Sequence, residues 1–161
     1  MRVIADLHMH SKYAMATSKY MDLDGIASGA MIKGISVMGS ADFLHPVWQK
    51  ELKEKLSEAN GIYEYKGINF ILTGEVSLVY KHDGKGRRVH HIIMAPSFEI
   101  LGQITEFFLR HGRVDYDGRP IFGMSSIAMT EALMQISKDI EIIPAHCLVP
   151  GTLIHTNPSV K

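Results

Sequence analysis

Short apolar runs alternate along this chain with segments whose apolar residues recur at helical spacing, and this alternation constrains the fold more than any other feature. Strands are predicted for the apolar runs at residues 2–6, 35–39, 69–80, 88–95 and 140–145, the first of them buried. Helices are predicted for residues 23–33, 47–58, 97–111 and 128–136. Strands that alternate with helices are typical of an α/β domain with a mainly parallel sheet.

Capping and turn residues mark several of the expected boundaries. Asp22 is a candidate N-cap for the first helix, and Gly34 is suited to end it. Pro46 suits the first turn of the second helix. The dipeptide Asp83-Gly84 is a turn signal in the polar segment before residue 88. The segment DYDGRP, residues 115–120, is predicted to be a loop.

Size, charge and cysteine content exclude several classes of protein. The 161 residues, 46% of them hydrophobic, are enough for one domain with a substantial core. Lys+Arg and Asp+Glu number 17 each, which excludes a highly charged disordered chain but allows a local basic surface. The single cysteine, Cys147, excludes a disulfide framework. Neither a membrane-spanning run nor a signal peptide is found, so a cytoplasmic location and no membrane partner are expected.

Histidines and carboxylates collect at the carboxyl ends of the predicted strands, where chemistry gathers in α/β folds. These residues are His8, His10, Asp42, His45, Glu75, His90, His91 and His146. Strand ends that meet at one edge would place these side chains close together. The remaining histidines, His82, His111 and His155, are expected to be solvated.

The pair His8 and His10 is suited to hold one metal ion, because residues two apart on an extended segment face the same side. Such a pair alone often arises by chance, but here further ligand types follow at later strand ends. Glu75 lies inside an apolar strand, where a carboxylate is costly unless it is paired or bound to metal. Asp42 has helix capping as its alternative role. His90 and His91 are adjacent, so only one of them can face the site.

Five segments in order, DLHMH, GSADFLHP, TGEVS, HHIIMAP and IIPAH, resemble the motifs of the PHP (polymerase and histidinol phosphatase) superfamily. The resemblance implies a distorted seven-stranded (β/α)7 barrel with two or three divalent ions (zinc, manganese, iron or magnesium) that hydrolyses phosphoesters. Longer stretches, including ADLHMHSKYAMATSKYM, RRVHHIIMAPS and DGRPIFG, resemble the endonuclease Q family. Those nucleases nick DNA 5′ to deaminated bases.

The resemblance also implies a role for each candidate. His8, His10 and Glu75 would hold one ion, and Glu75 would bridge to a second ion held by His91 and His146. His91 is preferred to His90 because the family histidine directly precedes the apolar run. Asp42 matches a family aspartate, but Phe43 replaces the histidine beside it, so a third ion is expected only if His45 compensates.

The expected reaction is attack on phosphorus by a metal-activated water. Glu75 and Asp42 are the candidate catalytic carboxylates. Arg88, with Arg87 and Lys12 as further candidates, would stabilise charge on the phosphoryl oxygens, the alternative being ordinary surface charge. DNA with deaminated bases is the expected partner. The alternatives are a small phosphomonoester of the histidinol-phosphatase type and a non-catalytic metal-binding scaffold.

Residues 1–146 are expected to be an incomplete PHP-type domain, truncated before the last strands of the barrel. The superfamily's last motif, which supplies an aspartate and a histidine, has no counterpart after His146. The fragment alone is therefore expected to bind metal weakly and to hydrolyse phosphodiesters poorly or not at all. Residues 147–161 resemble the start of an intein, with Cys147 as its nucleophile. A divergent or truncated end is the alternative.

Overall fold

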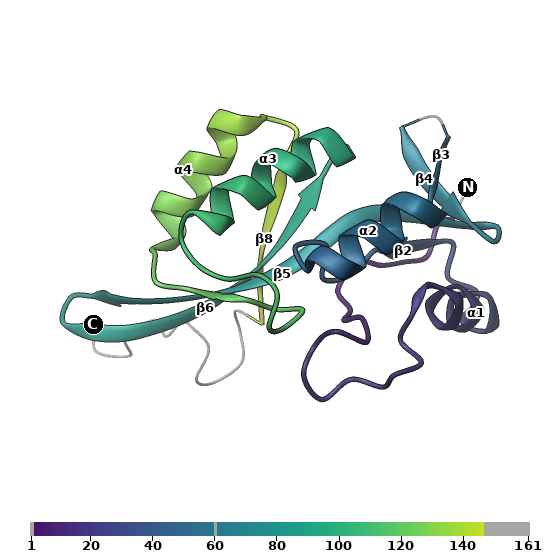
Figure 1. Ribbon diagram of the computed structural model, residues 1–161, viewed down its shortest axis with the longest axis horizontal. Coiled ribbons are helices and arrows are strands. Elements are labelled where there is room, and N and C mark those ends of the chain that lie inside the picture. Colours follow the sequence, from purple (N-terminus) through teal and green to yellow (C-terminus); the bar gives the residue numbers. More distant parts are fainter. Residues whose placement is uncertain (1, 60, 147–161) are drawn as a thin grey trace.

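The computed structural model of the protein describes residues 2–59 and 61–146, which form a mixed α/β domain (Figure 1). The elements, in chain order, are β1 (Ala5–Asp6), α1 (Leu23–Lys33), β2 (Val37–Gly39), α2 (Pro46–Lys55), β3 (Ser57–Ala59), β4 (Ile62–Tyr65), β5 (Ile68–His82), β6 (Lys85–Ala95), α3 (Phe98–Leu109), β7 (Ile121–Phe122), α4 (Ser126–Ile136) and β8 (Glu141–Ala145). The strands form one eight-stranded sheet. The α/β class expected from the sequence is therefore confirmed.

The expectation of a mainly parallel sheet is wrong. Strand β5 pairs in parallel with β2 and β7, and β1 pairs in parallel with β2. The remaining pairs, β3 with β4, β4 with β5, β5 with β6 and β6 with β8, are antiparallel. For the strands from β3 to β6 the cause is that consecutive strands are joined by short turns, which allow only antiparallel neighbours.

The β5–β6 hairpin is the longest feature of the sheet. Its two strands pair without interruption from Leu72 opposite Ala95 to His82 opposite Lys85. Asp83 and Gly84 form the two-residue turn with φ angles of 51° and 72°, as a turn compatible with the twist of a hairpin requires. The hairpin extends from the rest of the domain toward the left of Figure 1.

The residues that were predicted to bound α1 do so in the structure, whereas α2 and the first strand are shorter than predicted. Asp22 caps α1 by accepting a hydrogen bond from the Gly25 amide, and Gly34 ends the helix with φ 68°. Helix α2 ends at Lys55, earlier than expected, because the residues that follow it form β3 and pair with β4. The first strand is also shorter than expected: β1 pairs only with β2 at the border of the sheet, and it is not buried.

The core lies between the sheet and the helices. Its largest fully buried side chains include Trp48, Phe43, Phe70, Phe108 and Phe122. Helices α3 and α4 lie side by side on one side of the β5–β6 hairpin (Figure 1). Within the described residues, no helix is both long and apolar enough to cross a membrane.

Candidate metal centre

Glu75 lies at the centre of a histidine cluster. Its carboxylate is on β5, and the residue is only 1% exposed. One oxygen, Oε2, lies 3.4 Å from His8 Nε2 and 3.0 Å from His10 Nε2. The other, Oε1, lies 2.9 Å from His90 Nδ1 and 3.4 Å from His146 Nε2. Each carboxylate oxygen therefore faces its own pair of imidazoles.

The sheet explains why residues so far apart in sequence meet here. His8 and His10 follow β1, and their spacing of two lets both rings face Glu75. His146 follows β8, which pairs with β6, and its ring lies 4.9 Å from that of His8 between centroids. The structure thus brings together His8, His10, Glu75 and His146, four of the five residues that were expected to converge.

The fifth member of the cluster is His90, whereas the family resemblance favoured His91. His90 is directly opposite Ser77 on β5 and faces the same side of the hairpin as Glu75. The pleat turns His91 to the other side, where it is 4% exposed and burial lowers its pKa. The expectation that the histidine next to the apolar run faces the site is therefore corrected by the strand register.

The donor set fits divalent metal ions. Both oxygens of Glu75 and the Nδ1 atom of His90 are buried, yet none has the alignment of a hydrogen bond. Two ligands bound to one ion at about 2.1 Å each lie about 3.0–3.4 Å apart at octahedral or tetrahedral angles, and the four nitrogen–oxygen distances match this spacing. Two groups, His8 with His10 and Glu75, and Glu75 with His90 and His146, could each hold an ion.

The histidine rings and the carboxylates around Glu75 shift one another's pKa values. Burial alone would raise the pKa of Glu75, but His10, His8 and His90 outweigh it and hold that pKa well below its usual range. The hydrogen bond to Asp42, together with the negative charge of the nearby Glu75 carboxylate, raises the pKa of His10 to about 9. A metal ion bound to His10 would have to displace that proton.

Asp42 lies behind His10 and has no position in either ligand group. Its Oδ1 is 2.9 Å from His10 Nδ1, and its Oδ2 accepts hydrogen bonds from the Ser11 hydroxyl and amide. A carboxylate in this position fixes the orientation and tautomer of a metal-binding histidine. Ala41 and Asp42 have positive φ angles of 59° and 37°, a conformation that is costly for both residues.

Other candidates lie outside the cluster. His45 is 7% exposed and stacks on Tyr13, with ring centroids 4.3 Å apart, so the structure gives it a packing role. Lys12 pairs with Glu51 at 3.1 Å and is not directed at Glu75. Arg88 is exposed on β6, with its backbone two residues from His90. Cys147 lies outside the described residues.

Arg119 is a residue near the site that sequence reasoning missed. Its Nη1 atom lies 3.7 Å from Glu75 Oε2, and its side chain is 38% exposed. The loop that carries it is held by Asp117, whose Oδ1 accepts hydrogen bonds from the amides of Met15 and Arg119. Gly118 packs so closely that a Cβ there would lie 2.3 Å from Asp42 Oδ2. The only signal was the arginine within the turn segment DYDGRP.

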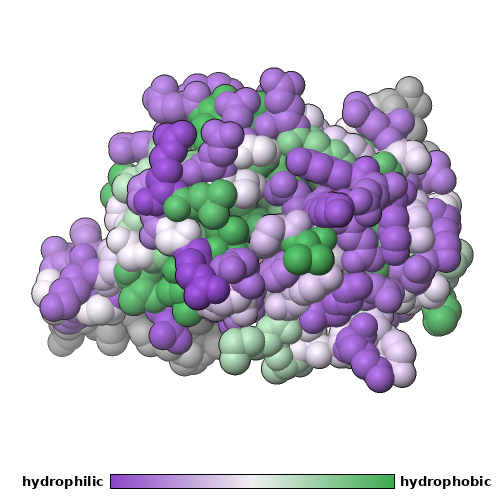
Figure 2. All heavy atoms as spheres, in the orientation of Figure 1, coloured by the Kyte–Doolittle hydropathy of each residue, from purple (hydrophilic) through white to green (hydrophobic). Residues whose placement is uncertain are grey.

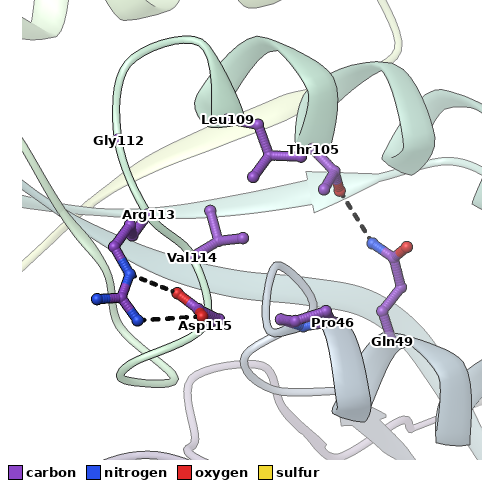
Figure 3. A pocket seen from close by; sticks show the side chains of 8 residues that line it. All are labelled: Pro46, Gln49, Thr105, Leu109, Gly112, Arg113, Val114 and Asp115. Atoms are coloured by element: carbon purple, nitrogen blue, oxygen red, sulfur yellow. Dashed lines mark hydrogen bonds and ion pairs between the residues drawn. The ribbon is translucent and has the colours of Figure 1, made fainter.

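A separate pocket of about 520 Å³ lies where the start of α2 meets the end of α3 (Figure 3). Gln49 Nε2 donates a hydrogen bond to Thr105 Oγ1 across it, and Arg113 pairs with Asp115 at its rim. None of its lining residues belongs to the metal-binding cluster.

Solved structures of a DNA endonuclease share this fold. The lesion-specific endonuclease PfuEndoQ from Pyrococcus furiosus matches 93% of the chain with a TM-score of 0.80 and 34% identity. A complex of endonuclease Q with a 27-mer duplex, which has an abasic lesion at the active site, matches 93% with a TM-score of 0.81 and 35% identity. The resemblance to the PHP domain of endonuclease Q, expected from the motifs, is therefore confirmed.

The chain corresponds to only part of its relatives. It spans 36% of each solved endonuclease Q chain. An uncharacterised protein of Methanocaldococcus jannaschii is 33% identical over 152 residues, which are 92% of this chain and 17% of that protein. No protein-family model matches the chain.

The two adjacent histidines give a direct test of the cluster. We expect His90→Asn to weaken metal binding by at least about tenfold at one of the two candidate ligand groups, because it removes a nitrogen donor from that group. His91→Asn should leave the number and affinity of bound ions unchanged, although it should lower stability because His91 is buried. Calorimetric titration with Zn²⁺ or Mn²⁺ measures both effects. The reverse pattern would show that the family assignment, and not the strand register, is correct.

Proposed function

We propose that this chain carries the metal centre of a DNA-repair endonuclease, which hydrolyses a phosphodiester bond beside a damaged nucleotide. The observation that carries the proposal is the position of Glu75, with one pair of histidines at each of its oxygens. A carboxylate between two ligand pairs is the arrangement expected of a two-ion hydrolytic site. The similarity to endonuclease Q supports DNA as the substrate.

In this proposal His8 and His10 would hold one ion, His90 and His146 would hold a second, and Glu75 would contribute to both ligand groups. When bound, the ions would lower the pKa of a coordinated water and neutralise phosphate charge. Asp42 keeps the His10 ring in place through Nδ1, so that Nε2 is directed at Glu75. Zinc, manganese, iron and magnesium are the candidate metals, and deaminated bases are the proposed lesion class.

The test is metal-dependent nicking by the complete gene product. Labelled duplexes containing a single uracil, hypoxanthine or abasic site are incubated with the metal-free protein and then with Zn²⁺, Mn²⁺ or Mg²⁺. We expect a nick 5′ to the lesion only when metal is present, and none in an undamaged duplex. Hydrolysis of p-nitrophenyl phosphate without any nicking would instead support a small phosphomonoesterase. Binding of metal with neither activity would support a scaffold.

We propose that Arg119 faces the phosphoryl oxygens, since its guanidinium is close to Glu75 and still partly exposed. Arg119→Gln is expected to lower kcat by about 10²–10³-fold, the usual cost of losing one donor to developing negative charge. Arg119→Lys should retain part of the rate, because it keeps the charge but loses the fork of donors. Metal stoichiometry should not change in either variant. An unchanged kcat in Arg119→Gln would exclude this role.

A further inference from the structure

The two sides of the β5–β6 hairpin differ in their surroundings. Because the pairing has no bulge, side chains at odd positions of β5 and even positions of β6 share the side that carries Glu75 and His90. Beyond the cluster, toward the turn, this side carries a set that we call the site-side row. It consists of Val79, Lys81 and Arg88.

The opposite side of the hairpin faces α4. Tyr80, on that side, lies with its hydroxyl 3.5 Å from the hydroxyl of Ser126 on α4. Arg87 and Lys85 also lie on this side, because they pair with Tyr80 and His82. Arg87 is partly buried, whereas Arg88 is exposed. The site-side row is therefore the more open of the two sides.

The hairpin is basic although the whole chain is neutral. Between Val76 and His91 the only acidic residue is Asp83, at the turn, against four lysines and arginines. Among the described residues, neither Lys81 nor Arg88 forms an ion pair with an acid. Hydrophilic residues cover the hairpin tip at the left of Figure 2. Two unpaired cations thus lie on the side of the strand that carries the metal-binding cluster.

Their spacing suits a chain of phosphates. Arg88 is two residues from His90, roughly 7 Å along the strand at about 3.4 Å per residue. Lys81 is opposite Gly86, a further two residues toward the turn. Gly86 carries no side chain at that level, and a Cβ there would meet nothing within 4 Å. A nucleic-acid strand carries one negative charge per nucleotide with a rise of about 3.4 Å, so positions about 7 Å apart correspond to every second phosphate along the strand.

We propose that the site-side row binds the phosphodiester backbone of the DNA strand next to the bond that is cleaved, with Arg88 nearest the metal centre and Lys81 beyond it. The inference rests on the proposed function, whose cluster defines which side is occupied. Arg88 can donate two parallel hydrogen bonds to one phosphate, and Lys81 acts as a point charge. Val79, 39% exposed and opposite Arg88, lies where a sugar would pack. Arg88 is thus a DNA-binding residue, not a catalytic one.

The hairpin supplies a matched control for this proposal. The double variant K81Q/R88Q removes two charges from the site side, and K85Q/R87Q removes two from the opposite side of the same hairpin. The probe is a fluorescein-labelled duplex with one abasic site, bound by the complete gene product in EDTA, so that binding is measured without cleavage. Anisotropy gives Kd over a series of KCl concentrations.

We expect K81Q/R88Q to weaken binding about 10–100-fold at low salt and to reduce the slope of log K against log[salt] by about 1.8, or 0.9 for each lost phosphate contact. K85Q/R87Q should stay within about threefold of the wild type. R88K should keep the wild-type slope, because the charge remains. Circular dichroism confirms that each variant is folded.

Equal losses in the two double variants would overturn the inference, since they would reflect net charge and not position. Wild-type binding by K81Q/R88Q, or no duplex binding by the wild type, would also overturn it. Nicking in the presence of metal is measured separately. If the wild type nicks the duplex and K81Q/R88Q binds it as tightly as the wild type, the proposed function stands and the inference fails. If only K81Q/R88Q loses binding but the wild type does not nick, the row keeps its role in DNA binding and the nuclease is rejected.

Discussion

Glu75→Gln is expected to abolish metal-dependent hydrolysis, with a loss of at least about 10³-fold in kcat/KM. The glutamine side chain has no charge and only one oxygen, so it cannot place an oxygen beside each of the two histidine pairs. The affinity for divalent ions should fall at both candidate ligand groups together, because both groups include this one carboxylate. Titration of the metal-free protein with Zn²⁺ or Mn²⁺, followed by a nicking assay, measures the two effects.

Glu106→Gln is the matched control, because Glu106 is an exposed glutamate on α3 whose side chain is 72% accessible. It should behave as the wild type in both measurements. If Glu75→Gln bound two ions with normal affinity, the bridging role would be wrong. If only one site were lost, Glu75 would belong to a single-ion centre.

Trp48→Ala is expected to have the largest effect on stability, about 3–5 kcal/mol in the free energy of unfolding. Trp48 is fully buried, and its Nε1–H donates hydrogen bonds of 2.9 Å to the carbonyls of both Ser40 and Ala41. These residues lead into the positive-φ turn at Asp42, so the variant also loses support for the carboxylate behind His10. Urea denaturation followed by circular dichroism at 222 nm measures the change.

Trp48→Phe separates packing from hydrogen bonding. It keeps an aromatic ring but leaves two buried carbonyls without their donor, which costs about 1–3 kcal/mol. A Trp48→Ala variant with an unfolding midpoint close to that of the wild type would mean that this side chain contributes little to the core.

The parts of the fold that the sequence predicted well are those set by local chemistry. Asp22 and Gly34 bound α1 as expected, and the Asp83-Gly84 turn joins β5 and β6. Strand direction depends on which segments pair across the domain, which apolar runs do not encode, and the sheet was therefore expected to be more parallel than it is. The short strands β3, β4 and β7 were missed because two to four residues carry too little periodicity to recognise.

The sequence also predicted some members of the cluster and missed others. The spacing of His8 and His10 and the isolated carboxylate of Glu75 are visible in the sequence. The choice between His90 and His91 depends on strand register, where a shift of one residue reverses the side. Arg119 could not be found by pattern, because its position depends on the close contact of Gly118 with Asp42.

Strand β5 connects the two halves of the candidate metal centre. Its residues up to Ile71 pair with β2 and β4, on the side of the sheet reached by His8 and His10, and from Leu72 onward it pairs with β6. Glu75 lies just past this change of partners. A bend in this single strand would therefore change the distance between the His8–His10 pair and the His90–His146 pair, so the spacing of the two candidate ligand groups depends on the shape of one strand.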